Sequence, residues 1–181
     1  KRAFDLAVAL VLAPVALPLC LLLLIAIRAE SPGAPLFVQQ RVGRDQKPFR
    51  MLKLRTMRAN TQNAASHLVG AAQITRLGAV LRKLKLDELP QLANILAGSM
   101  SLVGPRPALP SEVAAYPAPA LERLRVRPGL TGLWQVAGRA DIGFAKMIDM
   151  DVAYVRSRSL LLDVLLLAMT ARAVISGRGA Y

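Results

Sequence analysis

A long apolar run near the start of the chain dominates its pattern of hydrophobic and polar positions. Residues 6–27 include no charged side chain. A helix rises ~1.5 Å per residue, so a straight helix of this length just crosses the hydrocarbon core of a bilayer. Pro14 and Pro18 interrupt the run, and each removes a backbone donor and favours a bend. The pattern predicts a membrane helix over residues 1–30, broken at Pro18 or Pro14.

Basic residues flank this run on both sides. Lys1 and Arg2 precede it, and further cations follow it at Arg28, Arg41, Arg44, Lys47, Arg50 and Lys53. Positive charge favours the cytoplasmic side of a membrane, so both ends of the helix are expected there. A re-entrant helix, which enters one leaflet, bends and returns, meets that expectation. A kinked transmembrane helix is the alternative, because membrane helices tolerate proline.

A second apolar segment, residues 160–175, lies near the end of the sequence. Asp163 and Arg172 fall within it and make it a poor membrane span. A helix at the membrane interface would turn its leucines inward and its charges toward water. A buried core helix fits the same pattern, because periodicity alone does not separate the two.

Short strands and amphipathic helices are predicted between these two segments. Residues 36–40 and 49–55 are strand candidates, the second because basic and apolar residues alternate along it. Helical patterns begin at Thr75 and at Asp87, the second ends at Gly98, and another covers residues 144–155. The positions expected to face inward are Leu77, Val80, Leu81 and Leu84 in the first helix and Leu89, Leu92, Ala93 and Leu96 in the second.

Prolines and glycines punctuate two further segments, residues 103–110 and 127–132, which are predicted to be loops. Helices dominate the predictions, and the strands are few and short. We therefore expect an α-rich α+β fold. A re-entrant membrane helix would be followed by a small membrane-associated globular domain, residues 31–181, with amphipathic interfacial helices.

Composition narrows the possible functions. The 181 residues carry a net charge of +13, yet 54% are hydrophobic. A single Cys excludes a disulfide scaffold and a Cys/His zinc cluster, and a Ser–His–Asp site would depend on His67 alone. A basic surface attracts nucleic acid, anionic lipid or phosphorylated metabolites. The high hydrophobicity favours lipid among these anions.

An adjacent pair of acids, Asp87 and Glu88, stands out because acidic residues are scarce. The pair follows a basic helix, whose cations would hold a carboxylate ionised as a nucleophile or a metal ligand. Glu88 would orient its neighbour or share a cation. The alternative is structural, because Asp is a preferred helix N-cap and Pro90 suits a first helical turn.

Two other segments carry candidate chemistry. In residues 101–107, prolines and a glycine stiffen the backbone around Arg106, which suits bidentate phosphate binding, although a plain surface turn fits equally. Residues 127–139 combine glycines with Trp134, Gln135 and Arg139 and could cradle a nucleotide, although Trp is more often a core residue. Further cations cluster at Lys53 and Arg55 and around Arg82, where they could also form a solvated or lipid-facing surface.

Taken in order along the chain, these motifs resemble the bacterial sugar transferase family, the small monotopic phosphoglycosyl transferases. The matching segments are KRAFD at residues 1–5, the proline-broken run, FVQQRVG at 37–43, KLRTM at 53–57, LDELPQL at 86–92, residues 101–107 and 128–139, and GAY at 179–181. Each segment is weak alone, whereas all of them in sequence are highly specific.

The resemblance implies a reaction and assigns roles. Such enzymes transfer a sugar-1-phosphate from a nucleotide diphosphate sugar, usually UDP-linked, to a polyprenol phosphate such as undecaprenyl phosphate, releasing UMP. Asp87 would form a covalent phosphosugar intermediate with Glu88 as its partner, and Mg²⁺ would bind near Asp87. Phosphate binding would fall to Arg106 and Arg82. Nucleotide-sugar binding would fall to Lys53, Arg55, Gln135 and Arg139.

The resemblance also implies location and partners. The protein would lie on the cytoplasmic face of the bacterial inner membrane, in contact with lipids, and act in exopolysaccharide or glycoconjugate synthesis. Nucleic acid is not an expected partner, and a homo-oligomer is left open. The family often has an acid where Ser99 stands and a Ser where Leu17 precedes Pro18. The rival hypothesis is a membrane-anchored basic scaffold, which explains the charge and the apolar run but not the acid pair.

Overall fold

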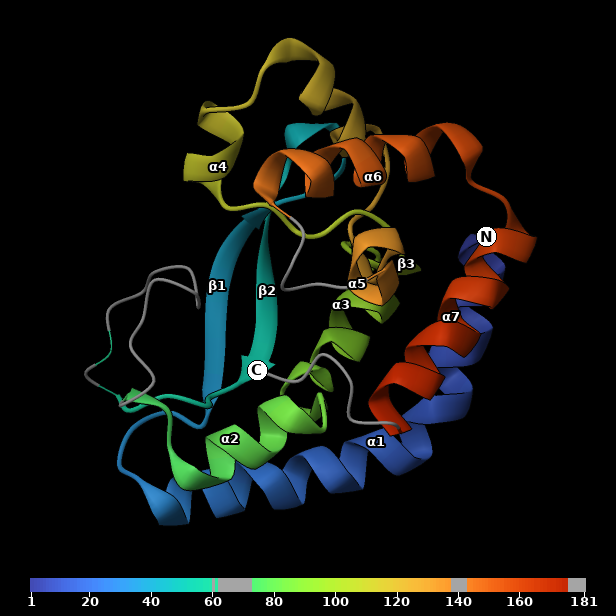
Figure 1. Ribbon diagram of the computed structural model, residues 1–181. Helices are drawn as coiled ribbons and strands as arrows, with labels where there is room; N and C mark the ends of the chain where they lie inside the picture. Colours follow the sequence, from blue (N-terminus) through green and yellow to red (C-terminus); the bar gives the residue numbers. More distant parts are fainter. Residues whose placement is uncertain (60, 62–72, 138–142, 176–181) are drawn as a thin grey trace.

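The computed structural model describes residues 1–59, 61, 73–137 and 143–175. Its strands are β1 (Leu36–Val42), β2 (Pro48–Leu54), β3 (Ser101–Val103) and β4 (Gly129–Thr131). Its α-helices are α1 (Arg2–Glu30), α2 (Arg76–Lys83), α3 (Gln91–Ala97), α4 (Pro110–Ala114), α5 (Leu133–Ala137), α6 (Phe144–Ser157) and α7 (Leu160–Ile175). The described residues also form the 3-10 helices η1 (Arg44–Gln46), η4 (Leu86–Glu88) and η5 (Ala118–Arg125). The predicted helix-rich composition with a small amount of sheet is confirmed (Figure 1).

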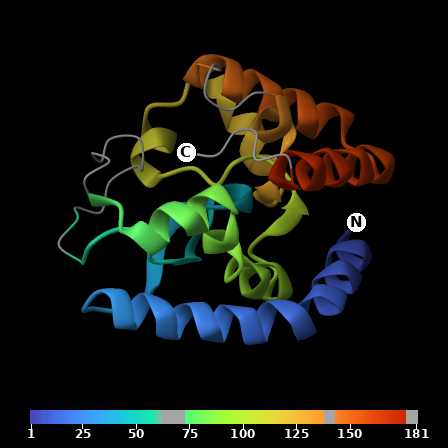
Figure 2. The same ribbon diagram turned by 60° about the horizontal axis from the view of Figure 1, so that its bottom comes forward.

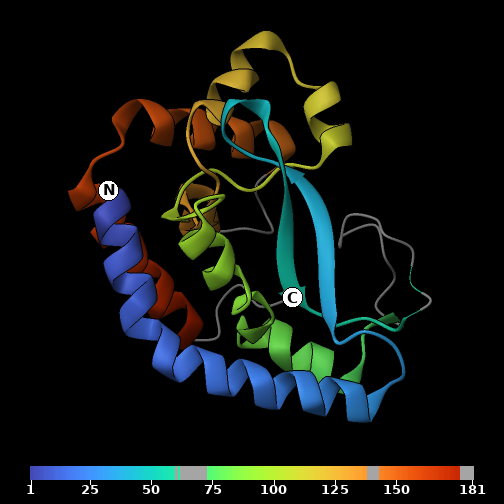
Figure 3. The ribbon, with the colours of Figure 1, turned by 180° about the vertical axis from the view of Figure 1, so that it is seen from behind.

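The long helix α1 bends part-way along its length. Its first half runs beside α7 and its second half passes beneath α2 (Figures 2 and 3). Pro14 and Pro18 lie inside the helix and account for the bend, since each removes a hydrogen bond and crowds the preceding turn. Among the described residues, α1 is the one helix long and apolar enough to cross a membrane, and 11% of its apolar window is buried in protein. Its re-entrant path and the division after residue 30 stay predictions.

The antiparallel hairpin β1–β2 confirms both predicted strands. Phe37 lies opposite Lys53 in its register, so these two side chains share one face. Buried Asn94 of α3 ties the edge of β2 to the helix: its Oδ1 accepts from Leu52 N–H at 3.0 Å, and its Nδ2 donates to the Arg50 carbonyl at 2.8 Å. The hairpin is thereby fixed against the segment that carries the acid pair.

Helix α2 begins where the sequence predicts, because the Thr75 hydroxyl accepts the Gly78 N–H at 2.9 Å as an N-cap. The predicted inward stripe is wrong in part. Val80 and Leu84 are 51% and 45% exposed, and only Leu81 is fully buried there. The reason is that α2 packs against its neighbours through the face that contains Gly78 and Leu81, and its other apolar side chains point outward.

The next helix, α3, begins at Gln91 rather than at Asp87, and Pro90 is its N-cap. It ends at Gly98, whose φ of 87° gives the left-handed C-cap that the sequence predicts. The expected inward positions Ala93 and Leu96 are exposed, whereas Asn94 and Ile95 are buried. The hydrogen bonds of Asn94 to β2 set this inward face. Apolar periodicity does not predict it, because Asn94 is polar.

A parallel pair, β3 and β4, replaces parts of the two predicted loops. Ser101 pairs with Gly129 and Val103 with Thr131. Strands of three residues are too short for hydrophobic alternation to reveal them. The backbones approach so closely that a Cβ on Gly129 would lie 2.1 Å from the Gly104 nitrogen. Glycine is therefore required at this contact.

Helix α7 has the predicted bounds and a strongly apolar outer face. Leu160, Leu161, Val164, Leu165 and Met169 are between 46% and 70% exposed. The expectation that its charges face water is wrong for Asp163, which is 1% exposed. Its carboxylate accepts from Lys1 Nζ at 2.6 Å and from the Tyr154 hydroxyl at 2.6 Å. The start of α1 neutralises this charge, which explains why it is buried.

Candidate active site

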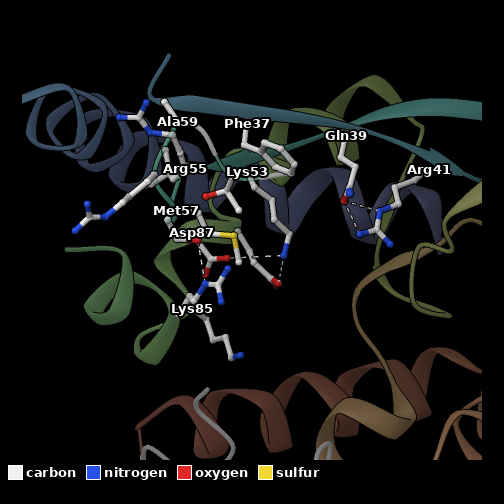
Figure 4. Close-up of a pocket in the computed structure, with 15 residues that line it drawn as sticks. Phe37, Gln39, Arg41, Lys53, Arg55, Met57, Ala59, Lys85 and Asp87 are labelled. Atoms are coloured by element: carbon white, nitrogen blue, oxygen red, sulfur yellow. Dashed lines mark hydrogen bonds and ion pairs between the residues drawn. The ribbon is translucent and has the colours of Figure 1, made fainter. Parts of the chain in front are cut away.

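A cavity of about 280 Å³ opens between the hairpin and the α2–η4 segment (Figure 4). Most of the charged residues that line it are basic. The residues around it are Phe37, Gln39, Arg41, Lys53, Leu54, Arg55, Thr56, Met57, Arg58, Ala59, Thr61, Arg82, Lys85, Asp87 and Glu88. Both acids singled out from the sequence therefore lie in one cavity with Lys53, Arg55 and Arg82.

The acid pair lies in the 3-10 turn η4, directly before α3. Lys85 precedes the turn in a left-handed conformation, with φ of 59°. The sharp change of direction leaves Asp87 7% exposed at the cavity wall. The alternative prediction that Asp87 is a helix N-cap is wrong, because Pro90 occupies that position.

Lys53 joins the two carboxylates. It reaches from β2 so that its Nζ lies 2.8 Å from Glu88 Oε1 and 3.8 Å from Asp87 Oδ2 (Figure 4). Burial raises the pKa of Asp87 above its ordinary value, and the charge of Lys53 is the largest influence that lowers it. Glu88 adds to the rise, whereas Lys85 and Arg82 oppose it. The cavity thus holds a basic carboxylate whose ionised form depends on surrounding cations.

Arg82 and Arg55 have different immediate partners. Arg82 Nε donates to the Thr56 hydroxyl at 2.9 Å, and burial lowers the pKa of Arg82 while the charge of Asp87 raises it. Arg55 donates to the carbonyls of Ser31 and Pro32 at 2.8 and 2.7 Å and so fixes the turn after α1. Of these two arginines, Arg82 is therefore the one with a direct electrostatic link to the acid pair.

Arg106 does not line this cavity. Its Nη1 donates to both oxygens of Glu112 at 3.1 Å, and its backbone N–H donates to Asp151 at 3.2 Å. Fully buried Arg123 pairs with Asp151 and donates to the Arg106 carbonyl at 3.0 Å. Several hydrogen bonds thus hold the loop around Arg106, but its guanidinium is engaged by a carboxylate.

Of the two candidates from residues 127–139, Gln135 is not among the residues that line the cavity. Gln135 lies in α5, and its Nε2 donates to the Leu130 carbonyl at 3.3 Å. Arg139, like His67, lies outside the described residues. The role of both remains a prediction.

Sequence reasoning gave no role to several lining residues, among them Gln39, Arg41, Thr56 and Lys85. A signal for two of them was available. Phe37, Gln39 and Arg41 occupy alternate positions of a predicted strand and so share one face. Lys85 and Thr56 depend on a left-handed turn and on the docking of α2, which no local pattern indicates.

The donor set suits a magnesium ion shared with a substrate. Within the described ranges, no three His, Cys, Asp or Glu side chains form a metal-binding group. Asp87 and Glu88 provide two carboxylates. Mg²⁺ is commonly held by one or two carboxylates together with substrate phosphates and water. The pair therefore fits a shared ion rather than a closed protein cage.

A comparison with protein families decides the identity of this arrangement. The model of the family described as bacterial sugar transferase matches residues 1–177. The chain belongs to the bacterial sugar transferase family. The resemblance found in the sequence is confirmed, and membership makes the protein a transferase enzyme, which agrees with the predicted phosphoglycosyl transferase.

Curated relatives extend the comparison within the sugar transferase family. The exopolysaccharide production protein ExoY of Sinorhizobium fredii is 41% identical over all of this chain and 88% of its own. The UDP-glucose:undecaprenyl-phosphate glucose-1-phosphate transferase of Caulobacter vibrioides is 39% identical over all of this chain and 72% of its own. The undecaprenyl-phosphate galactose phosphotransferase of Salmonella typhimurium is 36% identical, and the match covers 41% of that longer protein. The last two of these relatives carry different sugars, glucose and galactose, in their names.

Proposed function

We propose that this protein transfers a sugar-1-phosphate from a UDP-sugar to a polyprenol phosphate, giving a polyprenol diphosphate sugar and UMP. The observation that carries the proposal is the buried acid pair in a basic cavity, in a chain whose relatives are named undecaprenyl-phosphate sugar phosphotransferases. A diphosphate and a lipid phosphate are both anions that such a cavity attracts. The reaction would begin the assembly of an exopolysaccharide or glycoconjugate on its lipid carrier.

Asp87 would act as the nucleophile in the first half of the reaction. Its carboxylate oxygen forms a bond to the phosphorus that bears the sugar, and the bond from that phosphorus to UMP breaks with its electron pair on UMP. Burial makes Asp87 more basic, which favours nucleophilic attack, and the cations around it keep it ionised. The lipid phosphate then attacks the acyl phosphate and regenerates Asp87.

Lys53 and Glu88 would hold the nucleophile in place. Lys53 Nζ contacts Glu88 at 2.8 Å and lies near Asp87 at 3.8 Å, so the three groups form one charged unit. Asp87 and Glu88 would hold Mg²⁺, which would offset the charge of the diphosphate. Arg82, anchored by Thr56, would add positive charge beside the phosphate under attack.

The protein would act at the cytoplasmic face of the inner membrane. Exposed apolar side chains on α1, α2 and α7 support membrane contact, and the bend of α1 supports a re-entrant path. A single cysteine placed at residue 1, with Cys20 replaced by Ser, would report the topology through labelling from each side. Labelling from the cytoplasm supports the re-entrant path, and labelling only from the periplasm contradicts it.

The release of UMP tests the reaction. Purified protein is incubated with a panel of UDP-sugars, polyprenol phosphate and Mg²⁺, and nucleotide release is measured for the wild type and for Asp87→Asn. Asp149→Asn is the matched control, because Asp149 is exposed on α6. The wild type and Asp149→Asn should release UMP and Asp87→Asn should not. Equal release by all three would contradict the nucleophile, and no release with any sugar nucleotide would favour the basic scaffold.

A further inference from the structure

Arg41 lies in the same cavity as Asp87 but at a different end of it. Phe37, Gln39 and Arg41 alternate along β1 and line the cavity together. Phe37 lies opposite Lys53, the partner of the acid pair, and Arg41 follows four positions later, roughly 13 Å along the strand. Figure 4 shows Arg41 and Gln39 well separated from Asp87, with Lys53 between them. The cavity is thus cationic away from the nucleophile as well as beside it.

The guanidinium of Arg41 is held in a fixed orientation. Its Nε and Nη2 donate to Gln39 Oε1 at 3.0 and 2.5 Å, and its Nη1 donates to the Pro107 carbonyl at 2.8 Å. The next residue, Val42, donates its N–H to the Ala108 carbonyl at 2.9 Å. The hairpin and the loop that carries Arg106 therefore position Arg41 from both sides.

The charge of Arg41 has no carboxylate partner. The residue is 7% exposed, and in the part of the chain that the structure describes no acid lies within ion-pair distance of it. Its two acceptors are a neutral amide and a neutral carbonyl. Burial lowers its pKa to about 10, with the charge of Arg106 acting in the same direction and Glu112 and Tyr116 opposing it, so Arg41 remains cationic at neutral pH. A buried cation without a direct ion pair is costly, and an anion bound beside it would offset that cost.

The hydrogen bonds of Arg41 leave donors for such an anion. Three of the five guanidinium N–H groups are used, one on each nitrogen. One N–H remains on each terminal nitrogen, and this pair can donate to two oxygens of one phosphate. Gln39 thus orients the guanidinium without occupying all of it.

We propose that Arg41 binds the phosphate of the departing nucleoside monophosphate. This assignment rests on the proposed function. In an in-line displacement, the attacking and leaving oxygens lie on opposite sides of the phosphorus, and Arg41 lies at the end of the cavity away from Asp87. As the Asp87–phosphorus bond forms and the phosphorus–oxygen bond breaks, the leaving phosphate gains a negative charge and no proton moves. Arg41 stabilises that charge, and Gln39 is a positioning residue.

The test measures the first half-reaction alone. Wild type, Arg41→Gln and Arg41→Lys are mixed with the sugar nucleotide that the wild type accepts, in the absence of polyprenol phosphate, and UMP release in one turnover is timed. Inhibition by UMP and by uridine is measured in parallel. Arg50→Gln is the charge-matched control, because Arg50 lies exposed on the same hairpin.

Arg41→Gln should slow UMP release by at least about tenfold and weaken inhibition by UMP to a similar degree, the scale of a lost charge-assisted hydrogen bond. Inhibition by uridine should not change. Arg41→Lys should fall between Arg41→Gln and the wild type, and Arg50→Gln should match the wild type. If the melting temperature shows that Arg41→Gln does not fold, inhibition by UMP and by uridine is compared for Arg41→Lys instead.

Two results would overturn the assignment while leaving the proposed function intact. One is that the Arg41 variants release UMP, and are inhibited by UMP, to the same degree as the wild type. The other is an equal loss of inhibition by UMP and uridine, which would indicate that Arg41 only supports the cavity. A wild type that releases no nucleotide from any donor would instead contradict the proposed function itself.

Discussion

Replacing Gly78 with alanine should separate α2 from the segment that follows β2. A Cβ at position 78 would lie 2.1 Å from the Thr56 carbonyl oxygen and 2.7 Å from its carbon, which are backbone atoms that no side-chain rotation can clear. The two backbones must move apart by roughly 1 Å or more to reach an ordinary contact distance. The contact therefore depends on the absence of a side chain.

That displacement reaches the active-site cavity directly. Thr56 Oγ1 accepts from Arg82 Nε at 2.9 Å, and the Thr56 carbonyl accepts from Thr75 N–H at 3.1 Å. Both bonds would exceed hydrogen-bond length after a shift of that size. Overpacking costs roughly 1–3 kcal/mol. Because the clash is with backbone atoms, the cost should lie toward the upper end of this range. The higher helix propensity of alanine offsets up to about 1 kcal/mol of that cost.

The assay compares Gly78→Ala with Gly143→Ala, because a Cβ at position 143 meets no atom within 4 Å. Gly78→Ala should lower the apparent melting temperature by roughly 2–8 °C, since 1 kcal/mol corresponds to about 2–4 °C for a chain of this size. It should also lower kcat/KM for UMP release at temperatures where it remains folded. Gly143→Ala should match the wild type in both measurements. Wild-type stability and kinetics in Gly78→Ala would refute the reasoning.

Two further substitutions test the ion pair and the hairpin anchor. Lys53→Met removes the main influence that lowers the pKa of Asp87, so that pKa should rise further and the acid side of the rate–pH profile should move to higher pH. Lys146→Met is the control, because Lys146 is exposed. A Lys53→Met profile that does not move would contradict the role of Lys53. Asn94→Ala leaves the Leu52 N–H and the Arg50 carbonyl without their side-chain partner. Each buried unsatisfied group costs about 1–3 kcal/mol, and because these two groups are only partly buried, the lower part of that range applies and the total should be roughly 2 kcal/mol. A melting temperature equal to that of the wild type would show that β2 does not need this anchor.

Local patterns predicted several elements because their determinants are local. The alternation of residues 49–55 marks β2, the Thr75 cap marks the start of α2, and Gly98 marks the end of α3. Asp163 shows the limit of such reasoning. Its charge indicated a water-facing position, but Lys1, which is remote in sequence, and Tyr154 of the preceding helix both bond to it and permit burial. Tertiary pairing overrode the local pattern.

The candidate site, too, was predicted in part from local features and in part not. Scarcity of acids and a basic setting were enough to indicate Asp87 and Glu88. The sequence could not show that Lys53 bridges them, because that contact depends on the docking of the hairpin against η4. Nor could it show that Arg41 faces the cavity while Arg106 pairs with Glu112. Motif reasoning favoured Arg106 in its proline-rich loop, whereas burial without a direct ion pair distinguishes Arg41.

The mass of the protein after reaction with donor alone tests the central claim, that Asp87 carries the sugar phosphate. Wild type is incubated with its UDP-sugar in the absence of polyprenol phosphate, and the intact mass and the proteolytic peptides are measured at once. The account predicts one added sugar phosphate on the peptide that contains Asp87, loss of this adduct when polyprenol phosphate is supplied, and no adduct in Asp87→Asn. Stoichiometric release of UMP without an adduct, or an adduct that persists in Asp87→Asn, would contradict it.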